Sequence, residues 1–176
     1  MGDHVYDLAV VWVAVQVAGS GVGPVVAASA LTRLALGMLG GVLADRWDRR
    51  RAMIAADLLR AVTVGTLPVL AHAGRLQLWH LAAAAAVLAA LDSLFNPALL
   101  ASLPALAKDR TELQALNGLM DGTWRLALAV APSMAGLLVA LLPITQFFTL
   151  DAVSFLASVL AITALGRHLG QRPARV

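Results

Sequence analysis

Long apolar stretches separated by short polar turns are the feature that most constrains this chain. A helix needs about 20 mostly apolar residues to cross a hydrocarbon core about 30 Å thick. Stretches of this kind are Val22–Leu43, Met53–Leu70, Leu78–Leu94, Asn117–Leu142 and Ile144–Leu165. The core offers no water to a free backbone group, so a chain can span it only as helices or as a closed barrel. The sequence therefore predicts an all-α membrane protein.

A sixth apolar stretch, Val5–Val17, is only 13 residues long. We expect it to be a first helix that lacks its cytoplasmic half. Glycine, proline and charged residues mark turns at 19–24, 46–51, 73–75 and 104–112 and at Pro143. Because these turns are short, neighbouring helices should pack antiparallel in one bundle.

Composition narrows the class of protein further. The chain is 60% hydrophobic and only 13% charged, far from the balance of a soluble domain. It has no cysteine, and its four histidines are not clustered, so we expect neither a metal site nor a bound cofactor. Its excess of basic residues would favour nucleic acid in a soluble protein, but here membrane topology accounts for it. The expected partner is the lipid bilayer.

The basic residues in short loops predict the orientation, because loops rich in lysine and arginine stay in the cytoplasm. One set of segments, the loops 46–51 and 104–116 and the tail after Leu165, carries Arg46, Arg49, Arg50, Arg51, Lys108, Arg110, Arg167, Arg172 and Arg175. The opposite set carries Arg75. We therefore expect a multi-pass protein of the cell membrane with the first set facing the cytoplasm.

The turn at 46–51 belongs to a longer pattern, Gly41-x-x-x-Asp45-Arg46-x-x-Arg49-Arg50. This pattern resembles the signature loop between the second and third helices of major facilitator superfamily transporters, although Asp48 stands where that loop has glycine. The resemblance implies that these residues form a cytoplasmic latch, which holds the two halves of a transporter together in the outward-open state. The alternative is that the arginines serve topology alone.

Further segments extend the resemblance over nearly the whole chain. They are Gly2-Asp3, Gly19-Ser20, Asp57-x-x-Arg60, Phe95-Asn96-Pro97-Ala98, Asn117-Gly118 and Ser154-Phe155-Leu156-Ala157-Ser158. Together they are similar to the N-terminal six-helix half of exporters, in the branch that contains siderophore and macrolide exporters. This implies a 3+3 inverted repeat over residues 1–166, a cytoplasmic tail at 167–176 that begins the central loop, and a missing C-terminal six-helix half as partner.

The fifth apolar stretch also carries a pattern, Ala127-x-x-x-Ala131-Pro132-x-x-Ala135-Gly136. It resembles the antiporter motif of the same superfamily, with alanine at several glycine positions. Small residues let helices approach closely, and proline removes one backbone donor. The resemblance favours export. No arginine occurs in Leu78–Leu94, where many proton-coupled members have one, so proton coupling stays open.

Charges inside apolar stretches are candidate transport residues, because an ion near the membrane centre is costly without a partner. Asp7 and Arg33 each lie about 18 Å from a helix end, counted from Gly19 and Asp45. They are expected to pair, either as a proton- or substrate-responsive site or as a structural ion pair. Asp92 has no basic residue in its own helix. It can face a substrate or proton, or cap a break before Pro97.

Two pairs have the spacing of one helix face, Asp57 with Arg60 and Asp121 with Arg125. We expect structural or gating roles for both. Asp57 follows Arg51 by only about 9 Å of helix. It is therefore expected to join a charge network with the basic turn at the cytoplasmic end.

The sequence thus predicts a secondary transporter, of which this chain is one half, that exports small amphipathic molecules of drug or siderophore type. The residue types argue against an enzyme. Val17-Ala18-Gly19-Ser20-Gly21 lacks the first glycine of the Gly-x-Ser-Gly context of an intramembrane serine protease, and no histidine lies in the middle of a span. Asp57 is followed by Leu58 instead of the glycine of a phosphatidyl transferase. The alternative is a non-transporting fragment or accessory subunit, because a site between two halves cannot form from one.

Overall fold

The computed structural model describes residues 10, 14–15, 22–46, 48–141 and 143–164, without the side chains at 38–46, 105, 135, 138, 139, 144 and 145. Within these residues it has helices and no strand. The helices are α2 (Gly23–Arg46), α3 (Arg49–His72), α4 (Leu78–Leu106), α5 (Arg110–Leu141) and α6 (Ile144–Ala164). Most of the stretch Val5–Val17 lies outside the described residues. The all-α class is confirmed, whereas the six-helix half with its 3+3 repeat remains a prediction.

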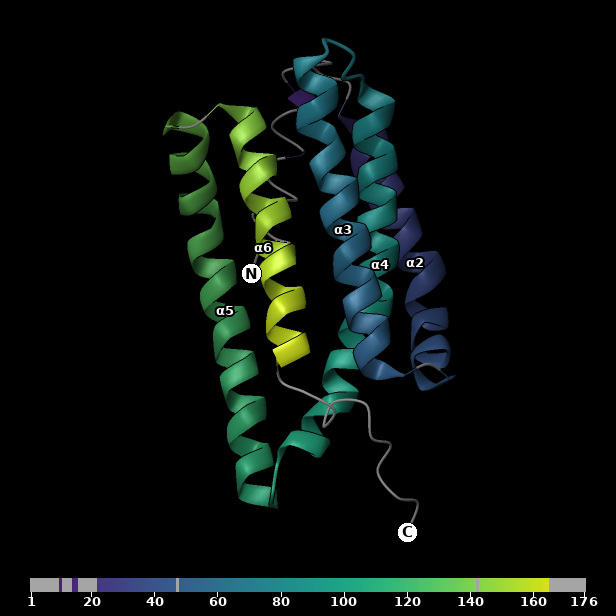
Figure 1. The fold of residues 1–176 in the computed structure, drawn as a ribbon, viewed down its shortest axis with the longest axis vertical. Coiled ribbons are helices and arrows are strands. Elements are labelled where there is room, and N and C mark those ends of the chain that lie inside the picture. Colours follow the sequence, from purple (N-terminus) through teal and green to yellow (C-terminus); the bar gives the residue numbers. More distant parts are fainter. Residues whose placement is uncertain (1–9, 11–13, 16–21, 47, 142, 165–176) are drawn as a thin grey trace.

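The helices lie side by side along the long axis of the molecule (Figure 1). Helix α4 packs against α2 and α3, and α3 packs in turn against α6. Helix α5 lies next to α6 and touches the rest of the bundle along little of its length. The best-packed part of the protein is therefore the group α2, α4, α3 and α6.

An apolar core joins these four helices. Its buried members are Val10, Ala14, Val25, Ala61, Val64, Leu67, Leu81, Ala84, Ala85, Leu88, Phe147, Phe148 and Phe155. Alanines on α3 and α4 let the helices approach closely, and the phenylalanines of α6 fill the space that remains. Near the other end of α3, Met53 packs with Ala98 and Ile162 in a smaller cluster.

Local chemistry sets the ends of α3. Asp48 is its N-cap: a carboxylate oxygen accepts a hydrogen bond from the backbone N–H of Arg51 at 2.8 Å. This explains why an acidic residue can stand where the related loop pattern has glycine. At the other end Gly74 has φ +65°, the left-handed conformation that favours glycine after a helix.

The fourth helix is longer than predicted. Its expected end was Leu94, with a turn at Pro104, but α4 continues through Pro97 and Pro104 to Leu106. Proline removes one donor and disturbs the neighbouring carbonyls, yet membrane helices tolerate it where other groups bind the freed backbone. Near the end of the helix the guanidinium of Arg49 donates to the Ala101 carbonyl at 2.7 Å, which ties the last turns of α4 to α3.

The predicted loop 104–116 is consequently wrong in extent. Helix α5 begins at Arg110, where the Asp109 carboxylate accepts from the backbone N–H of Glu112 at 2.7 Å. Only residues 107–109 connect α4 to α5. The predicted loop 46–51 shrinks in the same way, because α3 already begins at Arg49.

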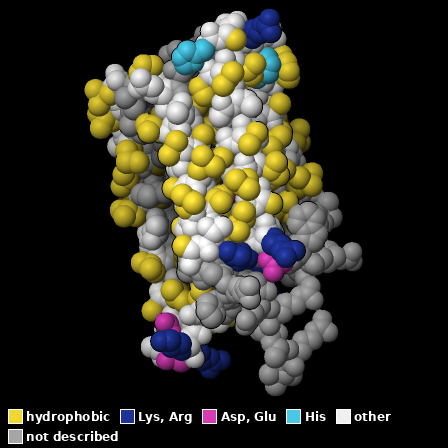
Figure 2. Space-filling model, viewed as in Figure 1, with side chains coloured by type: hydrophobic (Ala, Val, Ile, Leu, Met, Phe, Trp, Pro, Cys, Tyr) yellow, Lys and Arg dark blue, Asp and Glu magenta, His cyan; other side chains and the backbone are white. Residues whose placement is uncertain are grey.

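The two ends of the bundle have the composition expected at membrane surfaces. Lysine, arginine and acidic side chains gather at one end, a basic side chain and histidines lie at the other, and hydrophobic side chains cover much of the middle (Figure 2). The connections before α3 and before α5 lie at one end, and residues 73–77 lie at the other (Figure 1). By length and composition, Arg49–His72, Leu78–Pro104 and Gln146–Ala164 can cross a membrane, and Gly23–Gly37 is a shorter apolar helix.

Candidate functional site

Four charged side chains form a network across α2, α3 and α4. At its centre, the guanidinium of Arg60 on α3 donates to Asp57 Oδ1 at 2.8 Å and to a carboxylate oxygen of Asp92 on α4. Asp57 and Arg60 are 1% and 2% exposed. Arg33 on α2 lies 3.8 Å from the other Asp92 oxygen. We call Arg33, Asp57, Arg60 and Asp92 the ion network.

Two aromatic rings hold the central arginine in place. The Cζ atom of Arg60 lies 4.5 Å from the ring centroid of Phe95 and 5.6 Å from that of Phe155. A guanidinium over an aromatic face is attracted by the ring quadrupole, more strongly where water is excluded. Phe155 comes from α6, so all four well-packed helices contribute to the surroundings of the network.

The alternating order of charges explains how the network can be buried. An unpaired ion in a low-dielectric interior costs several kcal/mol, and the cost is offset only when opposite charges and hydrogen bonds surround it. Asp92 lies between the two arginines, and Arg60 lies between the two aspartates. Arg60 is 11 residues into α3, about 17 Å from its start, which is near the middle of a bilayer.

These contacts change two expectations. The Asp57–Arg60 pair is confirmed, but its described ion pairs lead to Asp92 of α4. Arg49 and Arg50 of the basic turn instead bind backbone carbonyls. Asp92 therefore has described partners on two other helices. Helix α4 is unbroken at Pro97, so Asp92 caps no break there. Asp7 lies outside the described residues, and its pairing with Arg33 stays a prediction.

The arginines at the start of α3 bind backbone carbonyls of neighbouring helices. Arg49 donates to Ala101 of α4, as described above, and Arg50 donates to Thr163 of α6 at 3.1 Å and to Ile162 at 3.5 Å. Carbonyls near the end of α6 are partly unsatisfied within the helix, and cations stabilise that end. Both side chains thus tie α3 to its neighbours inside this bundle.

The remaining latch residues are described only in part. Gly41, Asp45 and Arg46 lie in α2, in the segment whose side chains are outside the description. Their role as a latch remains a prediction.

Comparison with known proteins identifies the family. Residues 1–175 match the family described as transmembrane secretion effectors. The chain is 32% identical to the multidrug efflux pump Tap of Mycobacterium tuberculosis over 177 aligned positions, which cover 93% of this chain and 41% of that protein. The chain belongs to the transmembrane secretion effectors of the major facilitator superfamily.

Other relatives agree with this assignment. Tap of Mycolicibacterium fortuitum is 30% identical over 93% of this chain and 42% of its own length. Macrolide efflux protein A of Enterococcus faecalis is 27% identical over 75% of this chain and 41% of its own. The chain thus spans about two fifths of the length of these relatives. No solved structure matches it significantly.

The antiporter-like pattern on α5 is partly buried. Ala127 and Ala131 are 2% and 3% exposed, as expected for small residues that face another element. Pro132 and Gly136 are exposed, and the Ala135 side chain is outside the description. The helix continues through Pro132 to Leu141.

The second charge pair of the sequence lies on the same helix. Arg125 donates to Asp121 at 2.8 Å, so this pairing is confirmed. Its side chains are 75% and 60% exposed, and the two residues are one turn apart on one helix. The pair therefore differs from Asp57–Arg60 in burial although the bond length is the same.

Sequence reasoning missed Asp151. This residue lies on α6, four residues from both Phe147 and Phe155, and is 8% exposed like its buried neighbours on that face. A carboxylate inside an apolar stretch was the signal that could have found it. Among the described residues it joins Asp57 and Arg60 as a buried ionisable side chain.

Proposed function

We propose that this chain is the N-terminal half of a secondary transporter that exports small amphipathic molecules of drug or siderophore type. Its family is one of membrane transporters, and the relatives named above are efflux proteins for several drugs or for macrolides. In such transporters the substrate site lies near the midplane between two halves. The apolar middle and charged ends of this chain agree with that placement.

The observation that carries the proposal is the ion network. Its depth in the bundle matches the depth of a transport site, and ionisable residues there commonly belong to substrate or ion pathways. Arg60 is enclosed, whereas the side chain of Arg33 is 48% exposed. We therefore assign Arg60 and Asp57 a structural or gating role, and Arg33, Asp92 and the expected partner Asp7 a role in transport. A cationic substrate or a proton would compete with the arginines for Asp92.

The distribution of basic residues supports an orientation of the chain in the membrane. We infer that the ends bearing residues 46–51 and 104–116 and the tail 167–176 face the cytoplasm, because most loop arginines and lysines lie there. Gly41, Asp45 and Arg46 would then form the latch toward a C-terminal half. Arg49 and Arg50 would stabilise the start of α3 through their hydrogen bonds to α4 and α6.

A second candidate function has one observation in its favour. The chain spans only about two fifths of the length of its relatives, and one half cannot enclose a site between two halves. In that case the chain would be a non-transporting membrane fragment or an accessory subunit. The ion network would then serve stability alone.

Efflux measurements separate the two candidates. Cells would express the 176 residues alone, or together with a C-terminal half from a related exporter, and efflux of a macrolide or a fluorescent cationic drug would be followed. We expect efflux only with both halves. We expect Asp92→Asn to abolish efflux although the amount of this protein in the membrane is unchanged. Glu112→Gln is the matched control, because it neutralises an exposed carboxylate near the start of α5, away from the ion network.

Two results would contradict the proposal. If Asp92→Asn leaves efflux by the two halves unaffected, the ion network is not part of the transport site. Absence of efflux with every tested C-terminal half, although both halves are present in the membrane, would favour the fragment.

A further inference from the structure

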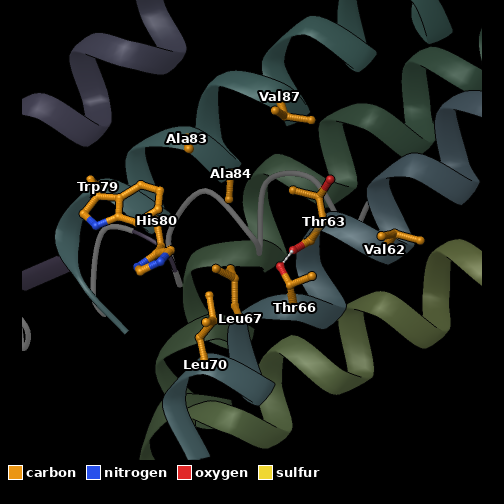
Figure 3. A pocket seen from close by; sticks show the side chains of 10 residues that line it. All are labelled: Val62, Thr63, Thr66, Leu67, Leu70, Trp79, His80, Ala83, Ala84 and Val87. Carbon is orange, nitrogen blue, oxygen red and sulfur yellow. Dashed lines mark hydrogen bonds between the residues drawn. The ribbon is translucent and has the colours of Figure 1, made fainter. Parts of the chain in front are cut away.

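Part of the alanine run Ala82–Ala86 of α4 lines a groove of about 270 Å³ between α3 and α4 (Figure 3). We call it the α3–α4 groove. It is lined by Val62, Thr63, Thr66, Leu67, Leu70, Trp79, His80, Ala83, Ala84 and Val87.

Helix geometry shows why the groove faces outward. At 3.6 residues per turn, Thr66 lies about 200° around α3 from Val64, which is fully buried in the core. Ala83 lies similarly about 200° around α4 from the buried Leu81. Ala83 and Thr66 are exposed, so the groove opens outward, while the core residues Leu67 and Ala84 also line it.

The size of the side chains makes the hollow. Ala83 and Ala84 are too short to fill the space beside α3, whereas Trp79, Leu70 and Val87 stand around it (Figure 3). From Trp79 to Val87 the helix rises about 12 Å. The groove therefore reaches from the end of the bundle well into the apolar depth of two helices that can each cross a membrane.

The polar groups in the wall are turned inward. Thr63 donates its hydroxyl hydrogen to the Leu59 carbonyl, and Thr66 donates to the Thr63 carbonyl, both at 2.7 Å. The two hydroxyls have thus used their donors within the helix, and the wall presents mainly methyl and methylene groups. A saturated hydrocarbon chain fits such a surface, because it needs no hydrogen bonds.

Cationic and interfacial side chains lie at the end of the groove. Trp79 and His80 stack with ring centroids 3.6 Å apart, and the indole N–H donates to Gln77 at 2.7 Å. An indole of this kind favours the membrane–water interface. Arg75 is exposed in the turn that joins the two walls of the groove. A phosphate at the membrane surface would meet this cation.

We propose that the α3–α4 groove binds one phospholipid with an anionic headgroup, from the leaflet on the Arg75 side. One acyl chain lies along Ala83 and Thr66, and the phosphate lies at Arg75. The apolar wall explains the chain, and the arginine explains the headgroup. This site is separate from the ion network and does not depend on transport.

Tryptophan quenching tests the proposal. The full chain would carry Trp79 as its sole tryptophan, with phenylalanine at positions 12, 47 and 124, in phosphatidylcholine vesicles with a minor fraction of lipid brominated on its acyl chain. We expect brominated phosphatidylglycerol to quench Trp79 more strongly than brominated phosphatidylcholine. Arg75→Gln should reduce this preference about fivefold, the factor for one cation near an anionic surface.

Matched variants locate the site. Ala83→Leu fills the groove at an exposed position and should abolish the preference, whereas Ala55→Leu, exposed on α3 outside the groove, should not. Thr66→Leu is the second filling variant if circular dichroism shows that Ala83→Leu has lost helix. Arg110→Gln removes one positive charge at the other end of the bundle. It is the control for the loss of charge in Arg75→Gln.

Three outcomes would overturn the proposal. Equal quenching by the two brominated lipids would show that the groove does not select an anionic headgroup. A preference that survives both filling variants would place the lipid elsewhere. A Trp79 that no brominated lipid quenches would show that protein, and not lipid, covers the groove.

Discussion

Removal of Arg60 is the sharpest test of the ion network. Methionine in Arg60→Met replaces the unbranched aliphatic part of arginine, but it leaves Asp57 and Asp92 without their central cation. Breaking a buried ion pair by removing one partner costs about 3–5 kcal/mol, because a charge remains in a medium of low dielectric. Since whole domains are stable by only about 5–15 kcal/mol, we expect a large part of the free energy of unfolding to be lost.

A double variant separates the ion pair from packing. Asp57→Asn added to Arg60→Met removes one of the two carboxylate charges that the single variant left without Arg60. The loss in the double variant should therefore be smaller than the sum of the two single losses by about 0.5–3 kcal/mol. The assay is unfolding of the chain in detergent micelles by increasing dodecyl sulfate, followed by helical circular dichroism. Arg125→Met is the control, because its pair with Asp121 has the same 2.8 Å bond but is exposed.

Burial distinguishes the two arginines. It predicts a clearly larger loss for Arg60→Met than for Arg125→Met. Equal losses would show that burial does not set the contribution of these pairs. Additive losses in the double variant would show that Asp57 and Arg60 do not interact.

Three further predictions concern the rest of the bundle. Arg50→Gln should lower the free energy of unfolding by about 1.5–3 kcal/mol in the same assay, because it removes charged hydrogen bonds to the end of α6. Ala127→Leu should cost about 1–3 kcal/mol by overpacking a buried position, whereas the exposed Ala129→Leu should have little effect. A cysteine at Arg75 should react with an impermeant label on intact cells and one at Lys108 should not, and the reverse result would invert the topology.

Local spacing predicted the parts of the site that lie within one helix. Asp57–Arg60 and Asp121–Arg125 were expected from separations of three and four residues, and both bonds are present. The bond from Arg60 to Asp92 joins residues 32 positions apart. It depends on how α3 and α4 pack, which no spacing along one helix encodes. The sequence therefore predicted the pairs but not the network.

Helix ends were the least predictable part of the fold. Pro97 and Pro104 were expected to end the fourth helix, as they would in water. The helix continues, and one carbonyl in its last turns, that of Ala101, binds Arg49 from a segment about 50 residues away. Such support comes from tertiary contacts. Among the described residues, three of the predicted stretches correspond to helices that can cross a membrane by length and composition, because membrane thickness acts on each helix separately, whereas α2 contains only the shorter apolar helix Gly23–Gly37.

The two charge pairs also indicate where the rest of a transporter would belong. Asp57–Arg60 is neutralised and enclosed by α3, α4 and α6, so this part of the bundle already provides the surroundings that buried ions need. Asp121 and Arg125 are exposed on α5, about 17 and 22 Å from its start, at a depth where lipid would surround them in an isolated bundle. Intramembrane charges almost always face protein or a water-filled cavity. We therefore expect the exposed side of α5 to face the segment by which the relatives exceed this chain, or the cavity shared with it.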